Sequence, residues 1–291
     1  MSDLLESVKN QTYRDLEVIV VEDNPGLLDE LSRLVAKKRM TNVRILTNQG
    51  PQGLSESRNV GILDSRGDIV AFTDDDVVLT KQWAEELRQT FKDKSIVAVW
   101  GSASPLWEDP SDNWFPKELD WLLSCTAWVE WKKITDVRNV QGYNMAFRRE
   151  VFDRCGLFPT HLGYHRGPLP EDLGFSMIVK DVMRKRIVYN PKVHVFHKAH
   201  HYRLTPKFIA ERSYWIGHSR RMLKAYYSDG SSSNVLSGES DLLKRILTRT
   251  LPNSVRSPKK LKLIFIVLFF AVLGYLVPGI RLQGLRKFSK D

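Results

Sequence analysis

The sequence predicts an α/β fold in which a Rossmann-like, mostly parallel sheet carries helices on both faces. Two observations lead to this prediction. Apolar, β-branched runs alternate with segments of helical periodicity through the first third of the chain. Acidic residues directly follow two of the predicted strands, as is common where ligands gather at the carboxyl ends of parallel strands. The 291 residues, 42% of them hydrophobic and 27% charged, suffice for one large domain or two small ones.

The predicted strands and helices follow one another along the chain. Apolar runs rich in Val and Ile predict strands at 16–23, 43–48, 68–76 and 95–103. Segments with helical spacing predict helices between them, at 25–39, 53–66 and 80–92. Proline opens the first of these helices, and Thr80 is expected to cap the last. This alternation favours right-handed βαβ connections and a parallel sheet.

The predicted strand at 68–76 ends in three consecutive aspartates. Neighbouring carboxylates repel one another, so the cluster needs solvent or a cation beside it. Because side chains two residues apart on an extended strand point the same way, Asp74 and Asp76 are expected to share a face. Two such carboxylates suit Mg²⁺ or Mn²⁺, and a diphosphate completes the coordination shell well. A solvated, Asp-rich turn is the alternative. Asp23, at the end of an earlier strand, is expected to face the same cleft.

The net charge of +10 comes almost entirely from the C-terminal tail. Residues 241–291 hold eleven Lys and Arg against two Asp, a balance of +9, which leaves +1 for the first 240 residues. Nucleic acid is therefore not an expected partner. The two cysteines lie far apart, and the four histidines between 194 and 201 have no carboxylate or cysteine partner at a suitable spacing. Neither a disulfide framework nor a zinc site is indicated.

The tail also contains an uncharged apolar run, residues 263–280, which predicts a transmembrane or re-entrant helix. A buried core helix is the alternative. A basic amphipathic segment at 241–262 precedes the run, and a basic tail at 281–291 follows it, as suits anionic lipid headgroups. Lys and Arg are more numerous before the run than after it, and the apolar-poor start of the chain leads us to expect no signal peptide. We therefore expect a domain at 1–230 on the cytoplasmic side of the cell membrane.

Five segments resemble, in their order along the chain, family 2 glycosyltransferases of the GT-A fold. They are QTYRDLEVIVVEDN, GLSESRNVGILDSRGDIVAFTDDD, GYNMAFRREVFDRCGLF, PEDLGFSMIVK and VHVFHK. The resemblance covers roughly residues 7 to 220, and the ordered set is more specific than any one motif. Within the family, the chain is most similar to archaeal enzymes that extend lipid-linked saccharides on dolichyl phosphate.

The resemblance implies which residues bind the donor and the metal. It assigns Asp23 to the nucleotide base, Arg58 to the base and phosphates, and Asp74 to the ribose. It assigns Asp76 and His197 to the metal. Each has a simpler alternative: Asp23 as a cap of the helix that follows it, Arg58 as a surface arginine, and His197 as a histidine at the end of a strand.

The resemblance also implies a catalytic base, Asp172 in PEDLGF. Capping of the following helix by Glu171 and Asp172 is the alternative. One base and direct in-line attack invert the anomeric centre, and a divalent ion neutralises the leaving diphosphate. A retaining double displacement needs a second carboxylate as nucleophile, and the sequence singles out none.

The function that the resemblance implies is metal-dependent transfer of a hexosyl or glucuronosyl group in protein glycosylation. The expected donor is a nucleotide-diphosphate sugar, with UDP as the expected nucleotide, and the expected acceptor is a lipid-linked saccharide at the membrane. Two other classes stay open. One is a sugar nucleotidyltransferase, although NQGPQGLSESR is a poor triphosphate-binding loop. The other is a catalytically inactive, membrane-tethered nucleotide-binding module.

Two further expectations concern the N-terminus and the tryptophans of the catalytic domain. The resemblance implies an apolar strand before the helix at 3–13, at the centre of the sheet, and we expect its coding sequence upstream of Met1. Tryptophans recur every seven residues from Trp107 to Trp128, which predicts one face of an amphipathic core helix. Stacking on sugars or contact with a bilayer interface are the alternatives.

Overall fold

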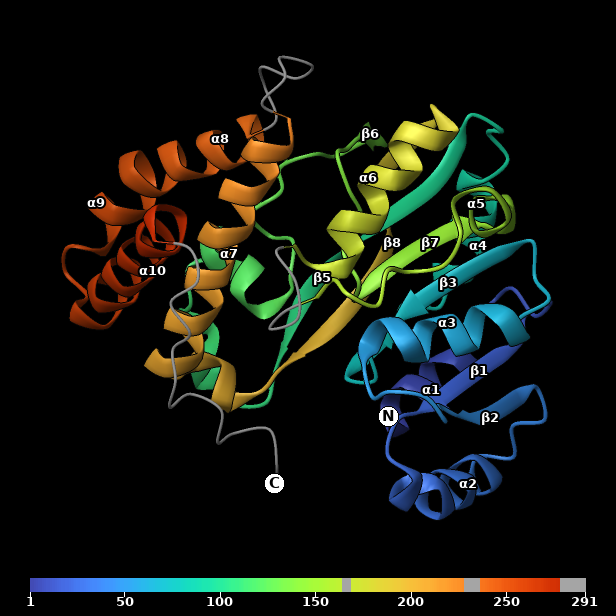
Figure 1. The fold of residues 1–291 in the computed structure, drawn as a ribbon. Helices are drawn as coiled ribbons and strands as arrows, with labels where there is room; N and C mark the ends of the chain where they lie inside the picture. Colours follow the sequence, from blue (N-terminus) through green and yellow to red (C-terminus); the bar gives the residue numbers. More distant parts are fainter. Residues whose placement is uncertain (164–168, 228–235, 278–291) are drawn as a thin grey trace. The chain divides into compact units, whose positions relative to one another are not determined.

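The computed structural model describes residues 1–163, 169–227 and 236–277 (Figure 1). These residues form two compact units. Unit 1 contains Met1–Ser104 and Trp131–His197, and unit 2 contains Pro105–Glu130 and the described residues from Lys198 onward.

The first part of unit 1 contains every strand and helix that the sequence predicts between residues 16 and 103. They are β1 Val18–Glu22, the 3₁₀ turn η1 Pro25–Leu27 with α2 Leu28–Lys37, β2 Val43–Thr47, α3 Leu54–Asp64, β3 Ile69–Thr73, α4 Trp83–Thr90 and β5 Ile96–Trp107. Helix α1 Ser2–Lys9 precedes them, and β4 Val77–Leu79 follows β3. The expected cap of α4 is wrong, because the N-cap residue is Gln82 and the Thr80 hydroxyl donates to the carbonyl of His194 instead.

The second part of unit 1 completes the sheet. It contains β6 Thr135–Asp136, β7 Asn144–Arg148, α5 Arg149–Cys155, α6 Glu171–Met183 and β8 Arg186–Ala199. The strands β3, β7, β5, β8 and β4 are neighbours in this order, and β6 pairs with β8 (Figure 1). The ladders β3–β7, β5–β7, β4–β8 and β6–β8 are antiparallel. The sheet is therefore mixed, which corrects the prediction of a mostly parallel sheet: β7 runs opposite to its neighbours β3 and β5, and β4 and β6 run opposite to β8.

Strands β1 and β2 form a separate parallel pair. Every residue of β1 and β2 is partly exposed, in contrast to β7, where only the last residue is. The further strand expected before Met1 lies outside the sequence and stays a prediction.

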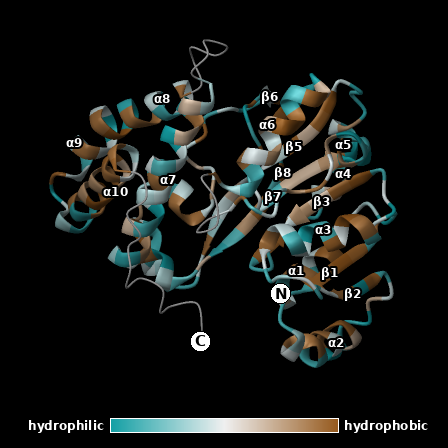
Figure 2. Cartoon of the chain, viewed as in Figure 1, coloured by the Kyte–Doolittle hydropathy of each residue, from teal (hydrophilic) through white to brown (hydrophobic). Residues whose placement is uncertain are grey.

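A cluster of phenylalanines holds α5 and α6 on the sheet of unit 1. Its members are Phe72, Phe147, Phe152, Phe158 and Phe175. The rings of Phe158 and Phe175 have centroids 4.4 Å apart, and those of Phe152 and Phe175 are stacked at 5.7 Å. Aromatic burial of this kind stabilises a core strongly. In the hydropathy view, the strands of unit 1 are mostly hydrophobic (Figure 2). The cluster therefore fixes the position of α6, whose first turn carries Glu171 and Asp172.

Unit 2 is helical. Its elements are the 3₁₀ turns η2 Pro110–Trp114, η3 Lys117–Leu123 and η4 His201–Leu204, then α7 Pro206–Tyr226, α8 Ser237–Arg245, the π-type turn η5 Ile246–Thr250, α9 Leu251–Ser254 and α10 Pro258–Leu276. The predicted tryptophan-lined helix is wrong: Trp107 lies on β5, whereas Trp114 and Trp121 lie on separate short turns. Pro110 and Pro116 explain the interruption, because proline favours helix starts and cannot continue a helix.

Helices α7 and α10 touch along their backbones. A methyl group added at Gly217 would stand 1.9 Å from the carbonyl oxygen of Ala271, and one at Gly274 would stand 2.0 Å from that of Tyr214. The Tyr214 hydroxyl also donates to the carbonyl of Val277 at 2.9 Å. Glycine is therefore required at both crossing points.

Helix α10 covers the described part of the apolar run at 263–280. It has 19 residues, and Lys259, Lys260 and Lys262 lie in its first turns. Among residues 1–163, 169–227 and 236–277, no helix combines the length and the apolar character that crossing a membrane requires. The predicted transmembrane helix is thus not supported. Residues 278–280 and the basic tail lie outside the described part.

Candidate functional site

The three aspartates lie in the turn between two short strands. Strand β3 ends at Thr73 and β4 begins at Val77. Strand β4 pairs with β8 so that Val77 lies opposite His197. This register brings a histidine from far along the chain beside the aspartate turn.

The turn and the histidine form a cluster of three potential ligands. The Nε2 atom of His197 lies 3.2 Å from Asp76 Oδ1 and 3.7 Å from Asp74 Oδ2. One oxygen or nitrogen from each side chain falls within 4.8 Å of the others. Asp75 is exposed and is not in the cluster. Asp74 and Asp76 converge as expected, although a turn and not an extended strand brings them together.

The burial of the cluster leaves one side open. The His197 side chain is fully buried, that of Asp76 is 16% exposed and that of Asp74 is 37% exposed. Beside His197, the Tyr143 ring lies 5.8 Å away between centroids, and the Trp100 indole N–H donates to the Tyr143 hydroxyl. Two carboxylates and an imidazole fit Mn²⁺ or Mg²⁺, and the exposed side leaves room for water or phosphate oxygens.

Asp23 forms hydrogen bonds with the loop before α3 and with the first turn of that helix. Its Oδ1 accepts from the Asn48 amide at 2.6 Å and from the Ser57 hydroxyl at 3.0 Å, and its Oδ2 accepts from the Gly53 N–H at 2.9 Å. Capping of the helix that follows Asp23 is wrong, because Asn24 caps η1 through the Gly26 N–H. The role of Asp23 toward a nucleotide base stays a prediction.

Arg58 lies inside unit 1 and is not a surface arginine. It is 8% exposed, and its Nη1 donates to Glu171 Oε1 at 2.7 Å. Its buried partner is therefore the first residue of α6. The predicted contact of Arg58 with a nucleotide stays a prediction.

Asp172 accepts two backbone hydrogen bonds in the first turn of α6. Its Oδ1 accepts from the adjacent Leu173 N–H at 2.6 Å, and its Oδ2 accepts from the Gly142 N–H at 2.8 Å. Burial and the neighbouring Glu171 carboxylate raise the pKa of Asp172 to about 6, against the opposing effect of Arg58. A carboxylate with such a pKa is suited to general base catalysis near neutral pH.

Sequence reasoning missed two members of this region. Glu171 was considered only as a helix cap, whereas it is the partner of Arg58. Gly142 was only part of a motif, whereas its N–H donates to Asp172. The sequence of α3 gives no local signal for the inward position of Arg58, because Ser55 shares the buried face while Leu54 and Leu63 of the same helix are exposed.

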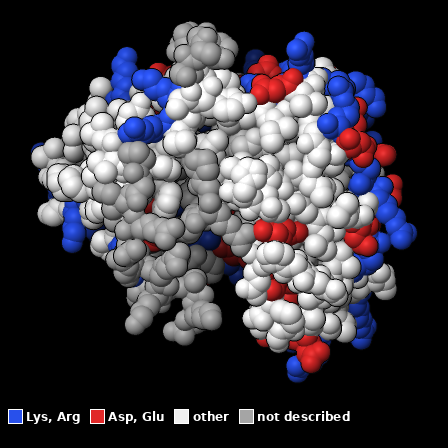
Figure 3. All heavy atoms as spheres, viewed as in Figure 1, with Lys and Arg blue, Asp and Glu red and all other residues white. Residues whose placement is uncertain are grey.

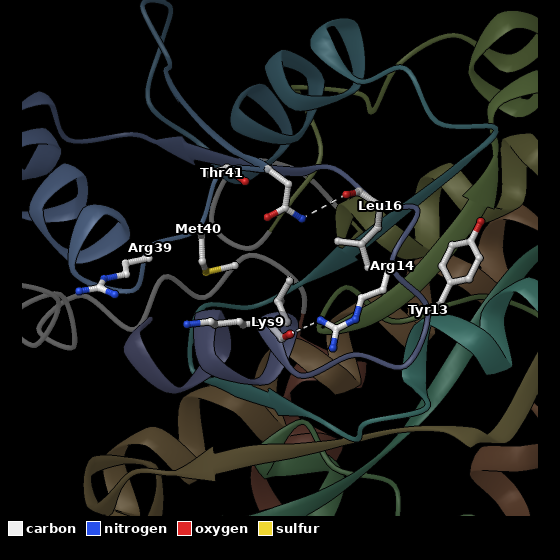
Figure 4. A pocket seen from close by; sticks show the side chains of 9 residues that line it. Lys9, Tyr13, Arg14, Leu16, Arg39, Met40 and Thr41 are labelled. Atoms are coloured by element: carbon white, nitrogen blue, oxygen red, sulfur yellow. Dashed lines mark hydrogen bonds between the residues drawn. The ribbon is translucent and has the colours of Figure 1, made fainter.

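A small pocket of unit 1 shares no residue with these clusters. It has a volume of about 130 Å³ and is lined by Val8, Lys9, Tyr13, Arg14, Leu16, Arg39, Met40, Thr41 and Asn42 (Figure 4). Arg14 donates to the carbonyl of Lys9, and Asn42 donates to that of Leu16. Its basic side chains are exposed and none is buried into the pocket. The pocket is therefore not the candidate active site.

The fold and the site define a class of protein. An α/β unit with a mixed sheet and an aspartate turn beside a buried histidine is typical of GT-A glycosyltransferases. The chain belongs to the family described as "Glycosyl transferase family 2", whose sequence profile matches residues 1–156. It is thus a glycosyltransferase of this family.

Relatives with known names agree with this assignment. The chain is 30% identical over 287 residues to the glucosyl-dolichyl phosphate glucuronosyltransferase of Haloferax volcanii, with 94% of this chain and 89% of that protein covered. It is 28% identical over 183 residues to glycosyltransferase AglE of the same organism, with 60% and 57% covered. A mannosyltransferase from Pyrobaculum calidifontis, solved with GDP-Man and Mn²⁺, has a similar fold. Its TM-score is 0.59 at 16% identity, with 95% of this chain and 83% of that chain covered.

Proposed function

We propose that the protein is an inverting, metal-dependent glycosyltransferase that moves a sugar from a nucleotide diphosphate to a hydroxyl of a polyprenyl-phosphate-linked saccharide. The observation that carries the proposal is the convergence of Asp74, Asp76 and His197 in the unit that also holds Asp172. The name of the Haloferax volcanii relative supports a dolichyl-phosphate-linked acceptor and a glucuronosyl or other hexosyl donor.

The aspartate turn and its neighbours bind the donor. Asp76 and His197 would hold a divalent cation, Mn²⁺ or Mg²⁺, whose charge would neutralise the diphosphate leaving group. Asp74, the most exposed of the three, binds the ribose of a UDP-sugar. Asp23 accepts a hydrogen bond from the base. Solved proteins of similar fold carry GDP-Man or UDP together with Mn²⁺, which supports this arrangement.

Proton transfer belongs to Asp172. Its carboxylate accepts the proton of the attacking acceptor hydroxyl, while the Gly142 and Leu173 N–H groups keep its orientation. A pKa of about 6 leaves the group ionised at neutral pH and still basic enough to accept a proton. Attack opposite to the leaving diphosphate inverts the anomeric centre.

The protein meets its lipid-linked acceptor at a membrane surface, and one face of α10 binds that surface. Phe265, Phe269, Val272 and Leu276 are 68%, 52%, 55% and 62% exposed and recur with helical spacing. The opposite face of α10 is buried. Basic residues precede this apolar face along the helix, and in Figure 3 the surface over α8 and α9 shows Lys and Arg beside uncharged residues. An apolar face with basic flanks suits a helix that lies in the plane of an anionic membrane.

The cell membrane, with unit 1 in the cytoplasm, is the proposed location. Nucleotide sugars are made in the cytosol, so the donor site has to face this side. The excess of Lys and Arg before the apolar run over those after it supports the same orientation.

A panel of nucleotide sugars tests the transfer. The protein is incubated with each donor, Mn²⁺ and a glucosyl-polyprenyl phosphate, and release of nucleoside diphosphate and formation of the new glycolipid are measured. We expect one donor to react, and Asp172→Asn to bind that donor with unchanged affinity but without turnover. Release of pyrophosphate from a sugar phosphate and a nucleoside triphosphate would identify a nucleotidyltransferase. Donor binding without any transfer would identify an inactive binding module.

Vesicle sedimentation tests the membrane contact. We expect the double variant Phe265→Ser and Phe269→Ser to lose binding to phosphatidylglycerol vesicles. Leu63→Ser is the matched control, because Leu63 is 75% exposed on α3 of unit 1. Equal binding of both variants would contradict the contact. Deletion of the whole tail is less informative, since α10 packs against α7.

A further inference from the structure

We infer that Arg58 and Glu171 form a positioning pair that fixes the orientation and the charge of the Asp172 carboxylate. This inference rests on the proposed function, in which Asp172 is the base. It assigns to Arg58 a task at the acceptor side of the reaction, away from the nucleotide.

The pair is buried and joins two helices that lie far apart in sequence. The Arg58 and Glu171 side chains are 7% and 9% exposed, and Nη1 lies 2.7 Å from Oε1 across a separation of 113 residues. Removing either charge leaves the other uncompensated in the interior, which is strongly unfavourable. The pair therefore holds the start of α6 against α3.

Packing fixes the guanidinium in one place. It lies 5.5 Å from the centre of the Phe158 ring, and Asn59, the next residue on α3, exchanges two hydrogen bonds of 2.9 Å with the backbone of Phe158. The ring of Phe158 in turn lies 4.4 Å from that of Phe175 on α6. The side chain of Arg58, which starts on α3, is thus held between the segment at Phe158 and α6.

The same guanidinium reaches the donor of the Asp172 hydrogen bond. A methyl group at Gly142 would stand 2.4 Å from Arg58 Nη2, so the arginine packs directly on the backbone there. The Gly142 N–H donates to Asp172 Oδ2 at 2.8 Å. Arg58 therefore contacts the residue before Asp172 and packs against the glycine whose N–H orients the Asp172 carboxylate.

Arg58 and Glu171 shift the pKa of Asp172 in opposite directions. Glu171 raises the pKa of Asp172, and Arg58 lowers it. On α5, which also packs against α6, Glu150 is paired with Lys185. Without Arg58, two adjacent carboxylates would share the start of α6 and retain a proton between them. With it, Asp172 stays available as a base at neutral pH.

Titration of Asp172 in two variants tests the pair. The carboxyl signals of ¹³C-labelled aspartates are followed by NMR, and Asp172→Asn identifies the signal of Asp172. We expect Arg58→Gln to raise the pKa of Asp172 by about one unit or more, and Glu171→Gln to lower it by a similar amount. Arg58→Lys should restore most of the wild-type value. A loosened structure alone would shift both variants in the same direction, and that outcome, or no shift, would overturn the inference.

Kinetics separate this role from contact with the donor. In Arg58→Gln, the acid limb of the pH profile of kcat should move in the same direction as the NMR pKa, while the Kd of the donor stays within about twofold of wild type. A loss of donor affinity without a change in the pKa would assign Arg58 to the donor and overturn the inference. Absence of transfer by the wild-type protein would refute the proposed function alone, because the titration does not depend on activity.

Discussion

Replacement of Asp172 by asparagine should make the protein more stable at neutral pH while it removes activity. The pKa of this group is raised from 3.8 to about 6 in the folded protein, chiefly by burial. Below about pH 4, both the folded and the unfolded chain carry a neutral carboxyl group, so its charge has no effect on stability. Between pH 4 and pH 6 the unfolded chain loses the proton first, so the stability of the wild-type protein falls as the pH rises. Above pH 6 the folded protein carries the full destabilisation that the ionised Asp172 carboxylate causes.

The size of the change in the free energy of unfolding follows from the pKa shift of Asp172. A change of about 2 pKa units corresponds to about 3 kcal/mol in the free energy of unfolding. Asparagine has one acceptor oxygen, so it keeps only one of the hydrogen bonds from the Gly142 and Leu173 N–H groups. This loss costs about 1 kcal/mol. We therefore expect Asp172→Asn to be more stable than wild type by about 2 kcal/mol at pH 7.5, from the difference of these two effects.

Urea unfolding from pH 4 to pH 8 checks this expectation. The difference in free energy of unfolding between Asp172→Asn and wild type should grow across the window from pH 4 to pH 6 and then stay constant. Asp29→Asn, at an exposed position on α2, corrects for the substitution itself. A difference that is independent of pH would refute the reasoning, because it would mean that Asp172 titrates alike in the folded and unfolded chain.

Three further outcomes follow from the geometry. Mn²⁺ should raise the melting temperature of the wild-type protein but not that of Asp76→Asn or His197→Ala, as differential scanning fluorimetry would show; equal shifts would exclude these ligands. Gly274→Ala should destabilise by about 1–3 kcal/mol through its clash with α7, whereas Gly238→Ala, which has open space around it, should not, in thermal unfolding of both. Asn144→Ala should cost about 3 kcal/mol or more, measured by urea unfolding, because this buried side chain accepts from Trp83 and donates to the carbonyls of Ser102 and Val193.

The early strands and helices could be predicted because their patterns are local. Strands β1, β2, β3 and β5 are apolar runs with clear ends, and the three helices between them have regular spacing. The direction of the sheet could not be predicted in this way. It depends on β7, which lies far along the chain and pairs antiparallel with β3, and on β8, which pairs antiparallel with β4.

In the candidate site, too, local features could be predicted from the sequence and long-range contacts could not. Asp74 and Asp76 are close in sequence, so their convergence could be expected. The position of His197 beside them depends on the register of β4 with β8, which follows from packing of the whole sheet. The partnership of Arg58 with Glu171 is also non-local, since 113 residues separate them. The inward position of Arg58 on α3 is not visible locally either, because Ser55 shares the buried face while Leu54 and Leu63 are exposed.

The residues proposed for the chemistry and the face proposed for membrane contact lie in different units. Every residue assigned to donor, metal or base, from Asp23 to His197, lies in unit 1, whereas the exposed apolar face of α10 lies in unit 2. If the proposed membrane contact holds, a change in membrane affinity through Phe265 or Phe269 should therefore leave the chemistry of unit 1 untouched. His197 is the last residue of unit 1, and the same strand continues to Ala199 in unit 2. The chain thus passes directly from the proposed metal ligand into the unit that we propose meets the membrane. The helices of that unit should therefore be able to vary in sequence without rebuilding the site, provided that β8 keeps its register with β4.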